Sequence, residues 1–282
     1  MQHSENADGF HDRVFAMPKH SIVFLMYHEL ALPRRPICQE EPGYSRYVLT
    51  ENEFRSQIEF LKQHGWGGLS LSQALAYPEG HCICITFDDG CETDLLAVAP
   101  ILRQARYAAT FFVTTGRLGR TGYLSHQQVR ELSALGFEIG CHSMTHAYLT
   151  DLDEKGLQRE ICDAKSQLEQ IVGRAVEHFS CPGGRFDQRV LFTARGAGYR
   201  SLSTSRLQAN SATTNPFALG RVPVLRDISL SDFAAICEGT SLSRLRAQTA
   251  VRDIAKRLLG NAVYDRLRAR LLRSDVQRNG TL

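Results

Sequence analysis

Residues 81–90 read His-Cys-Ile-Cys-Ile-Thr-Phe-Asp-Asp-Gly, and this stretch decides the fold. Its short apolar run is typical of a buried strand. The strand ends at two adjacent carboxylates, Asp88 and Asp89, which are costly to bury unless something compensates their charge. Carboxylate oxygens bind zinc and harder cations, whereas Asp-Gly is also a common turn dipeptide. The stretch alone therefore leaves a metal or catalytic site and a plain turn as alternatives.

Strands and helices alternate along the chain on both sides of this stretch. We expect further strands over 22–27, 109–115, 137–141, 176–181, 199–204 and 220–225. Helices are expected between them, over 51–64, 71–77, 95–106, 126–135, 153–172, 188–197 and 229–237. Repeated strand-helix units predict an α/β fold with a parallel sheet and helices outside it. Their number fits a (β/α) barrel, complete or distorted, with its active site at the carboxyl ends of the strands.

Composition and charge indicate a globular protein and bear on which partners it has. The chain has 282 residues, 43% of them hydrophobic and 22% charged, which is ordinary for a soluble globular protein. Ten Lys or Arg and three Asp lie in 244–278, so this tail carries +7 and the rest of the chain −4. We therefore expect no nucleic-acid binding. Three parts are predicted: a loose arm over 1–20, a catalytic domain over 21–240 and a basic amphipathic helical tail over 241–282.

The first residues and the cysteines predict the compartment. The N-terminal stretch lacks a basic region followed by an apolar one, so we expect no signal peptide. Eight cysteines without a small disulfide-scaffold pattern indicate free thiols in a reducing compartment. We expect a cytoplasmic protein. Its basic tail could lie on the anionic inner face of the membrane or pack on the barrel with a solvated basic face, and its oligomeric state is not predicted.

Two histidines directly follow the strand expected over 137–141. His142 and His146 are four residues apart, so they share one face if the segment forms a helical turn. That spacing suits two imidazoles on one metal ion. Together with Asp89 they supply three protein ligands and leave a position open for water, as a catalytic metal requires.

These motifs carry a resemblance to a known family. Residues 86–90 and 142–146 resemble the first two motifs of the polysaccharide deacetylases (the NodB-homology domain, carbohydrate esterase family four), and Phe179–Gly184 resembles the third. The order of elements over 22–237 is similar too. The resemblance implies a distorted (β/α) barrel. It also implies metal-dependent hydrolysis of N-acetyl groups on an amino-sugar polysaccharide or its precursor.

The resemblance assigns a role to each motif residue. Asp88 matches the general base, and Asp89, His142 and His146 match the ligands of one divalent metal ion. Zinc is the expected ion, with other transition metals as alternatives. The implied partner is an N-acetylated carbohydrate. An O-acetyl esterase, a small-molecule amidase on the same site and a catalytically silent carbohydrate-binding member are the alternative functions.

The general acid departs from the common family pattern. Most members use a histidine in a late Leu-X-His motif, but this sequence has no histidine after His178. A branch of the family that acts on bacterial exopolysaccharide is circularly permuted and takes this histidine from an N-terminal Tyr-His strand. Met26-Tyr27-His28 resembles that signature, which implies that His28 is the general acid.

The third motif also departs from the common form. Many members have an arginine that pairs with the base at the position of Ser180. Arg185 and Arg221 are the candidates to replace it, and the alternative for each is a solvated arginine in a loop. The substrate-binding segment is predicted to be Pro182, Gly183, Gly184 and Arg185, with glycines that let the backbone approach a sugar. An ordinary Pro-Gly turn is compatible with this. We expect the cysteines beside the motifs, Cys91, Cys141 and Cys181, to be small buried residues rather than soft zinc ligands.

Overall fold

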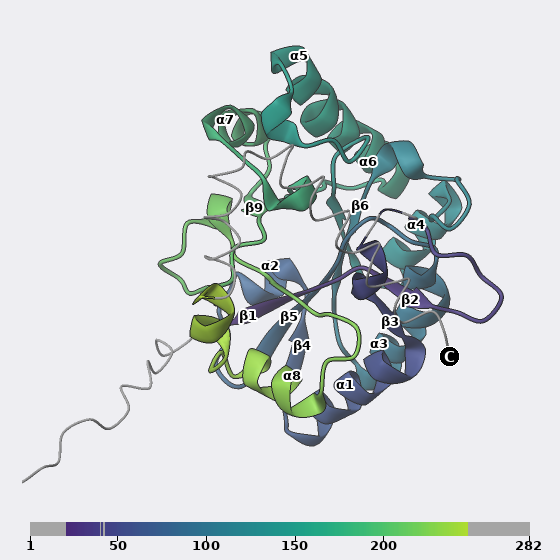
Figure 1. Ribbon diagram of the computed structural model, residues 1–282. Helices are drawn as coiled ribbons and strands as arrows, with labels where there is room; N and C mark the ends of the chain where they lie inside the picture. Colours follow the sequence, from purple (N-terminus) through teal and green to yellow (C-terminus); the bar gives the residue numbers. More distant parts are fainter. Residues whose placement is uncertain (1–20, 40, 42, 248–282) are drawn as a thin grey trace, which may run out of the picture.

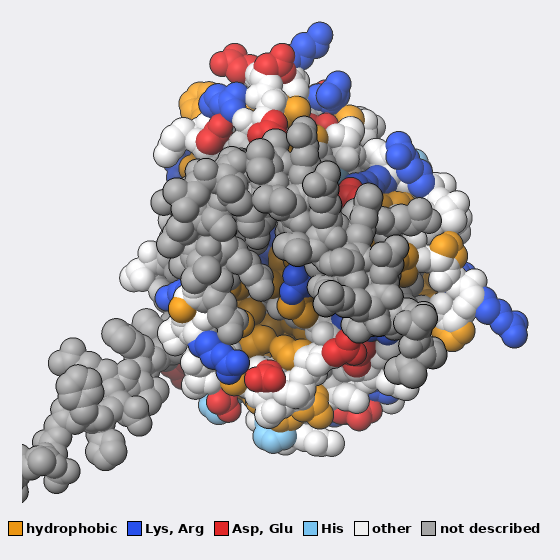
Figure 2. Space-filling model, in the orientation of Figure 1, with side chains coloured by type: hydrophobic (Ala, Val, Ile, Leu, Met, Phe, Trp, Pro, Cys, Tyr) orange, Lys and Arg blue, Asp and Glu red, His pale blue; other side chains and the backbone are white. Residues whose placement is uncertain are grey.

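The computed structural model describes residues 21–39, 41 and 43–247 (Figure 1). The predictions for the arm over 1–20 and for the tail beyond residue 247 lie outside these residues. Within them, no helix has the length and apolar character needed to cross a bilayer. Acidic and basic side chains are interspersed on the described part of the face shown in Figure 2.

A parallel sheet forms the centre of the molecule. Its strand order is β10-β1-β5-β6-β7-β8-β9, and β4 pairs with the first half of β5. The strands are β1 (Val23–Tyr27), β4 (Gly67–Leu69), β5 (Cys82–Phe87), β6 (Thr110–Val113), β7 (Glu138–Cys141), β8 (His178–Ser180), β9 (Ser201–Ser203) and β10 (Val222–Pro223). Five of the six residues of β5 are buried, because this strand lies inside the sheet with helices outside it.

The sheet curls until its two edges are joined by one segment. Leu219 forms a parallel bridge with Ser203 of β9, and three residues later Val222 pairs with Leu25 of β1. The segment 219–222 therefore bridges β9 and β1 and closes the curled sheet. The α/β class and the distorted (β/α) barrel predicted from the sequence are confirmed.

Helices surround the sheet in an outer layer (Figure 1). They are α1 (Glu51–Gln63), α2 (Leu71–Ala74), α3 (Ala99–Ala105), α4 (His126–Ala134), α5 (Glu154–Leu157), α6 (Ala164–Val172), α7 (Gln188–Gly196) and α8 (Leu230–Cys237). Reciprocal capping boxes begin α1 at Thr50, α2 at Ser70 and α4 at Ser125, because a hydroxyl and the Glu or Gln three residues later satisfy free N–H groups of the first turn.

Two of the expected helices contain a π-helical turn. The turn η2 (Asp94–Val98) precedes α3, and the turn η5 (Gln158–Asp163) joins α5 to α6. The long helix predicted over 153–172 is therefore present over 154–172, with a π-helical turn in its middle. Such turns occur often at functional sites, and η5 places the buried side chain of Glu160 beneath a loop of the candidate site.

A second, two-stranded parallel sheet lies beside the barrel. Its strands are β2 (Glu29–Ala31) and β3 (Val48–Thr50). The loop between them, which includes the short turn η1 (Tyr44–Tyr47), returns over the carboxyl end of β5. This brings Gln39 and Tyr47 to the site described next.

Candidate active site

Asp88 and Asp89 follow β5 directly and are both 2% exposed. The N–H of Asp88 donates to the carbonyl of Tyr27 at 3.0 Å, so the β1–β5 ladder continues one step past the strand. Asp89 then adopts a left-handed backbone conformation with φ 80°, which Asp tolerates better than most residues. This turn separates two adjacent carboxylates into different environments.

Asp89 faces two imidazoles. Its Oδ1 lies 3.3 Å from His146 Nε2 and 3.7 Å from His142 Nε2. This oxygen is buried and has no hydrogen-bond partner among the described residues. The Nδ1 of His142 lies 2.9 Å from the carbonyl of Ser180, and since a carbonyl can only accept, Nδ1 carries the proton. The lone pair of Nε2 is therefore directed at the cluster, as in histidine ligands with an oriented second nitrogen.

Burial affects the protonation states of Asp89, His142 and His146. It lowers the pKa of His142 to about 3 and that of His146 to about 4, so both imidazoles are neutral near pH 7, the form that binds metal. Burial also raises the pKa of Asp89. A cation among the three donors would remove this cost. The buried Oδ1 without a partner and the two neutral nitrogens fit one divalent ion, and three protein ligands leave a position open.

The loop over 142–146 has an irregular conformation, so the histidines come together without the helical turn that their spacing would suit. Ser143 and His146 have positive φ of 63° and 68°. The buried carboxylate of Glu160 accepts hydrogen bonds from Met144 N–H at 3.0 Å, from Thr145 N–H at 2.7 Å and from Thr145 Oγ1 at 2.8 Å. These bonds replace the ones that a helix would supply, so Glu160 holds the loop in the shape that brings the histidines together.

Asp88 has a different set of partners. Arg221 donates to both of its oxygens at 2.7 Å, and Ser180 Oγ donates to Oδ2 at 3.3 Å. Burial opposes ionisation of Asp88, but the Arg221 guanidinium outweighs it and holds the pKa of Asp88 well below its usual range. Of the two arginines considered from sequence, Arg221 is the one that binds this carboxylate. Arg221 is itself buried, and its Nη2 donates to Ser180 Oγ at 2.7 Å.

His28 follows β1 at the same end of the sheet. Tyr27 pairs with Phe87 across β1 and β5, so His28 and Asp88 leave neighbouring strand ends. Burial lowers the pKa of His28, and Asp89 and then Asp88 act in the opposite direction, which places the imidazole within electrostatic reach of both carboxylates. Its ring packs on Tyr47 at a centroid distance of 4.7 Å, and its Nδ1 has no hydrogen-bond partner in the described part of the chain.

Gln39 is a site residue that the sequence did not indicate. Its amide nitrogen donates to Asp89 Oδ2 at 2.7 Å, so Oδ2 is engaged while Oδ1 is not. Gln39 lies in the long loop between β2 and β3, where no motif or periodicity marks it. Its role arises entirely from the tertiary path of that loop.

The segment predicted to bind substrate forms the turn η6 (Pro182–Gly184). A Cβ on Gly183 would approach Tyr148 Cε1 to 2.7 Å, and one on Gly184 would approach Ser205 Oγ to 2.0 Å. Both glycines also have positive φ. Packing against these neighbours therefore already explains the glycines, as the turn interpretation allowed. The guanidinium of Arg185 lies 3.8 Å from the centroid of the half-exposed Tyr148 ring.

The comparisons with known proteins agree with the motifs. The polysaccharide deacetylase family model matches residues 76–202. The putative polysaccharide deacetylase YxkH of Bacillus subtilis is 28% identical over 220 residues, which cover 76% of this chain and 75% of that protein. The peptidoglycan-N-acetylglucosamine deacetylase of Bacillus cereus is 37% identical over 135 residues, covering 48% of this chain and 61% of that protein.

Two further proteins are similar to this chain over longer stretches than the family model matches. The poly-β-1,6-N-acetyl-D-glucosamine N-deacetylase of Staphylococcus aureus is 23% identical over 200 residues, covering 64% of this chain and 69% of that protein. The structure of the Streptococcus pyogenes deacetylase PplD has the same fold, with a TM-score of 0.69 at 23% identity over 77% of this chain and 98% of that one. Residues 76–202 thus match the polysaccharide deacetylase family of hydrolases, and the motifs, the fold and these relatives agree with that match.

Proposed function

We propose that residues 21–240 form a metal-dependent hydrolase that removes N-acetyl groups from an amino-sugar polysaccharide or its precursor. One observation carries the proposal: the buried Oδ1 of Asp89, without a partner in the described residues, faces two neutral imidazoles beside a separately held carboxylate. The family's relatives in Bacillus cereus and Staphylococcus aureus are both named as N-acetylglucosamine deacetylases.

Asp89, His142 and His146 would hold the ion, and zinc is the first candidate because an Asp with two His is a common catalytic zinc set. When bound, the ion would polarise the acetyl carbonyl and lower the pKa of a water molecule. Gln39 fixes the rotamer of Asp89 by donating to its other oxygen.

Asp88 is the proposed general base. Its Oδ2 lies 3.9 Å from His142 Nε2, so the carboxylate borders the ligand cluster without belonging to it. Arg221 and Ser180 fix its orientation and keep it ionised. From this position the carboxylate accepts the proton of the attacking water, a step for which general bases typically contribute about 10²–10⁴-fold in rate.

His28 is the proposed general acid. The departing amine of an amide needs a proton, because an amine anion is a very poor leaving group. His28 lies at the end of β1, next to the strand that carries both aspartates, and Tyr47 packs against its ring. Burial lowers the pKa of His28, and the two carboxylates act against this by favouring its protonated form. A histidine there can deliver a proton to the sugar nitrogen while Asp88 acts on the water.

The sugar itself would lie against the third motif. The half-exposed Tyr148, with the Arg185 guanidinium over its ring, offers an aromatic and cationic surface next to the turn η6 at the carboxyl end of β8. We propose Pro182–Arg185 as the segment that borders the bound sugar.

The direct test is acetate release from a panel of oligosaccharides. Purified protein is incubated with N-acetylglucosamine oligomers in β-1,4 and β-1,6 linkage and with matched O-acetylated sugars. Release from the N-acetylated oligomers, lost in Asp88→Asn, supports the proposal. Release from the O-acetylated sugars alone would make the protein an esterase. Sugar binding without acetate release would make it a silent carbohydrate-binding member.

A further inference from the structure

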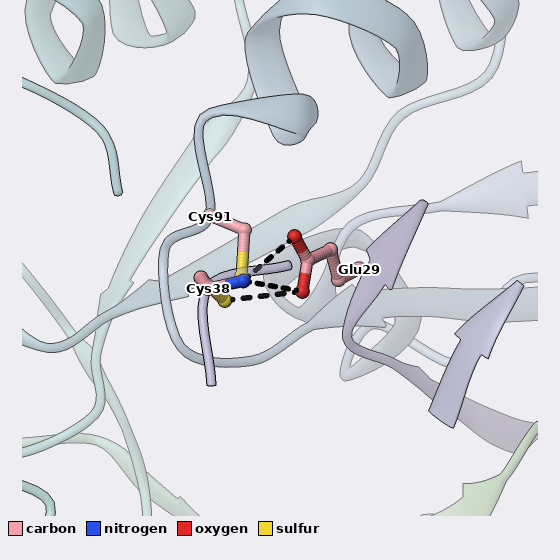
Figure 3. A group of neighbouring side chains, drawn as sticks. All are labelled: Glu29, Cys38 and Cys91. Carbon is pink, nitrogen blue, oxygen red and sulfur yellow. Dashed lines mark hydrogen bonds between the residues drawn. The ribbon is translucent and has the colours of Figure 1, made fainter. Parts of the chain in front are cut away.

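A second group of potential metal ligands lies next to the active-site strand. Glu29 of β2, Cys38 of the following loop and Cys91 after β5 converge on one point from three segments (Figure 3). One donor atom from each lies within 4.8 Å of the other two. None of these residues belongs to the catalytic cluster, whose donors are one oxygen and two nitrogens.

The contacts inside the group are close. Cys38 Sγ lies 3.2 Å from Glu29 Oε2, and the Cys38 N–H donates to both oxygens of Glu29 at 3.0 Å. The hydroxyl of Tyr44 lies 3.2 Å from Cys38 Sγ and 3.6 Å from Cys91 Sγ. Bonds of about 2.0–2.3 Å around a tetrahedral zinc separate neighbouring ligand atoms by roughly 3.3–3.8 Å. The distance between Cys38 Sγ and Glu29 Oε2 is therefore already near the spacing that such an ion imposes, and a donor atom of Cys91 lies within 4.8 Å of donor atoms of both residues.

The charges around the group lack a cationic partner among the described residues. Glu29 is 2% exposed and appears in none of the ion pairs of that part of the chain. Asp94, whose N–H donates to the carbonyl of Cys91 at 3.0 Å, is fully buried. Both of its carboxylate oxygens lack a hydrogen-bond partner within the described ranges. A buried carboxylate without a cationic partner is costly, and a cation bound by Glu29 would reduce that cost.

We propose that Glu29, Cys38 and Cys91 form a second metal site, for a soft divalent cation such as Zn²⁺. Two thiolates and one carboxylate are a donor set that soft cations prefer over Mg²⁺ or Ca²⁺. Each thiol releases its proton to solvent as the metal–sulfur bond forms. The fourth position is left to water.

The site would anchor the surroundings of Asp89. Cys38 immediately precedes Gln39, which donates to Asp89 Oδ2, and Cys91 follows Asp89 by two residues. An ion bound to both cysteines would tie the β2–β3 loop to the turn that carries Asp89. Its role is structural, in contrast to the open cluster on Asp89, His142 and His146.

Thiolate-to-metal charge transfer distinguishes the two sites, because the catalytic donors include no sulfur. Chelator-stripped, reduced protein is titrated with Co²⁺ or Cd²⁺ while the ultraviolet thiolate band and the bound metal are measured. We expect two equivalents to bind and the band to appear with one of them. His142→Ala should lose one equivalent and keep the band, so failure of the catalytic assignment remains distinguishable from failure of this one.

Variants of the proposed ligands complete the test. Cys38→Ala and Cys91→Ala should each remove or strongly reduce the band, whereas the control Cys162→Ala, at a half-buried thiol in η5, should leave it unchanged. Glu29→Gln keeps both thiols but removes the carboxylate ligand. It should lower metal affinity by more than the factor of about 10–100 that is typical of losing a residue that only orients a ligand. If a cysteine variant fails to fold, the metal affinity of Glu29→Gln tests the proposal instead.

Three results would overturn the proposal. The first is a single equivalent of metal without a thiolate band in the reduced wild type. The second is a band that Cys38→Ala leaves intact. The third is a Cys38–Cys91 disulfide in the purified protein together with no uptake of metal at these sulfurs after reduction.

Discussion

Asp88 and Asp89 are neighbours in the chain, yet their surroundings prepare them for different tasks. Asp88 is bound on both oxygens by Arg221 and stays ionised. Asp89 has one oxygen bound by Gln39 and one directed at two imidazoles. A base must remain charged and free to take a proton, whereas a ligand needs a lone pair aimed at the metal. The contacts of each carboxylate therefore support the proposed division of roles.

Replacing Asp88 by Asn tests the base. The amide cannot take up the proton of the attacking water, so acetate release should fall by about 10²–10⁴-fold. The metal content measured on the purified variant should stay at the wild-type value, because Asp88 is not a ligand. Loss of metal together with activity would mean that Asp88 belongs to the ligand set.

Replacing Arg221 by Lys tests how the base is held. Lysine keeps a positive charge but cannot donate to both oxygens of Asp88 in the fork geometry of a guanidinium. The pKa of Asp88 should rise, and the acidic limb of the kcat/KM profile should move to higher pH. An unchanged acidic limb with a lowered rate would indicate that Arg221 acts on packing alone.

Replacing His28 by Gln tests the acid. Hydrolysis of an N-acetyl sugar should fall by about 10²–10⁴-fold, because the amine leaves only after protonation. An aryl acetate should be largely spared, since its phenolate is a stable leaving group. Parallel measurements on both substrates decide the role, and equal losses would make His28 a structural residue.

At the scale of residues, the sequence indicated those with a motif and missed those without one. Asp88, Asp89, His142 and His146 sit at strand ends with recognisable neighbours, so they could be named in advance. Gln39 and Glu160 act through folded contacts that no local pattern encodes. Arg221 was one of two candidates, because its partner lies 133 residues away.

At the scale of elements, the loop over 142–146 is shaped by the buried Glu160 of η5 and its hydrogen bonds to Met144 and Thr145. The four-residue spacing would place both histidines on one face of a helical turn, but spacing alone does not distinguish a turn from a loop held by a distant carboxylate. Strand positions and capping boxes were predictable, because alternation and hydroxyl-to-acid spacing are local signals.

Replacing Glu160 by Gln should loosen this loop. One carboxylate oxygen becomes an NH₂ group, which cannot accept from the N–H and hydroxyl groups that Glu160 binds. His146 should be held less well, and metal affinity should fall by about 10–100-fold, as for other partners that orient a ligand. Isothermal titration on stripped protein measures this. The exposed Glu154→Gln in α5 is the control, and equal affinity in both variants would contradict the role of Glu160.

At the scale of the whole molecule, closure of the barrel supplies the arginine that binds the proposed base, Asp88. The segment 219–222 joins β9 to β1 and carries Arg221 between the two contacts. The guanidinium then reaches Asp88 at the end of β5, next to β1. The sequence predicted the alternating units but not how the edges of the sheet meet. The identity of the arginine could therefore be read only from the closed fold.

Buried histidines should make the metal-free protein sensitive to acid. The unfolded chain protonates His146 near its ordinary pKa of 6.5, whereas the folded protein keeps it neutral down to about 4. Between these values the unfolded state binds more protons, so stability falls as pH falls. Thermal unfolding in chelator should show a falling Tm from pH 6.5 to 4.5. His146→Gln should flatten that slope, and an identical slope in the variant would exclude this histidine as its source.

The central claim is that hydrolysis depends on a metal ion held by Asp89, His142 and His146. The most direct measurement is acetate release from an N-acetylglucosamine oligomer by chelator-stripped protein as Zn²⁺ is added back. Stripped wild type should be inactive and recover full activity on addition of the ion, whereas stripped His142→Ala should stay inactive at the same zinc concentration. Full activity in the stripped wild type, or full recovery in His142→Ala, would contradict the claim.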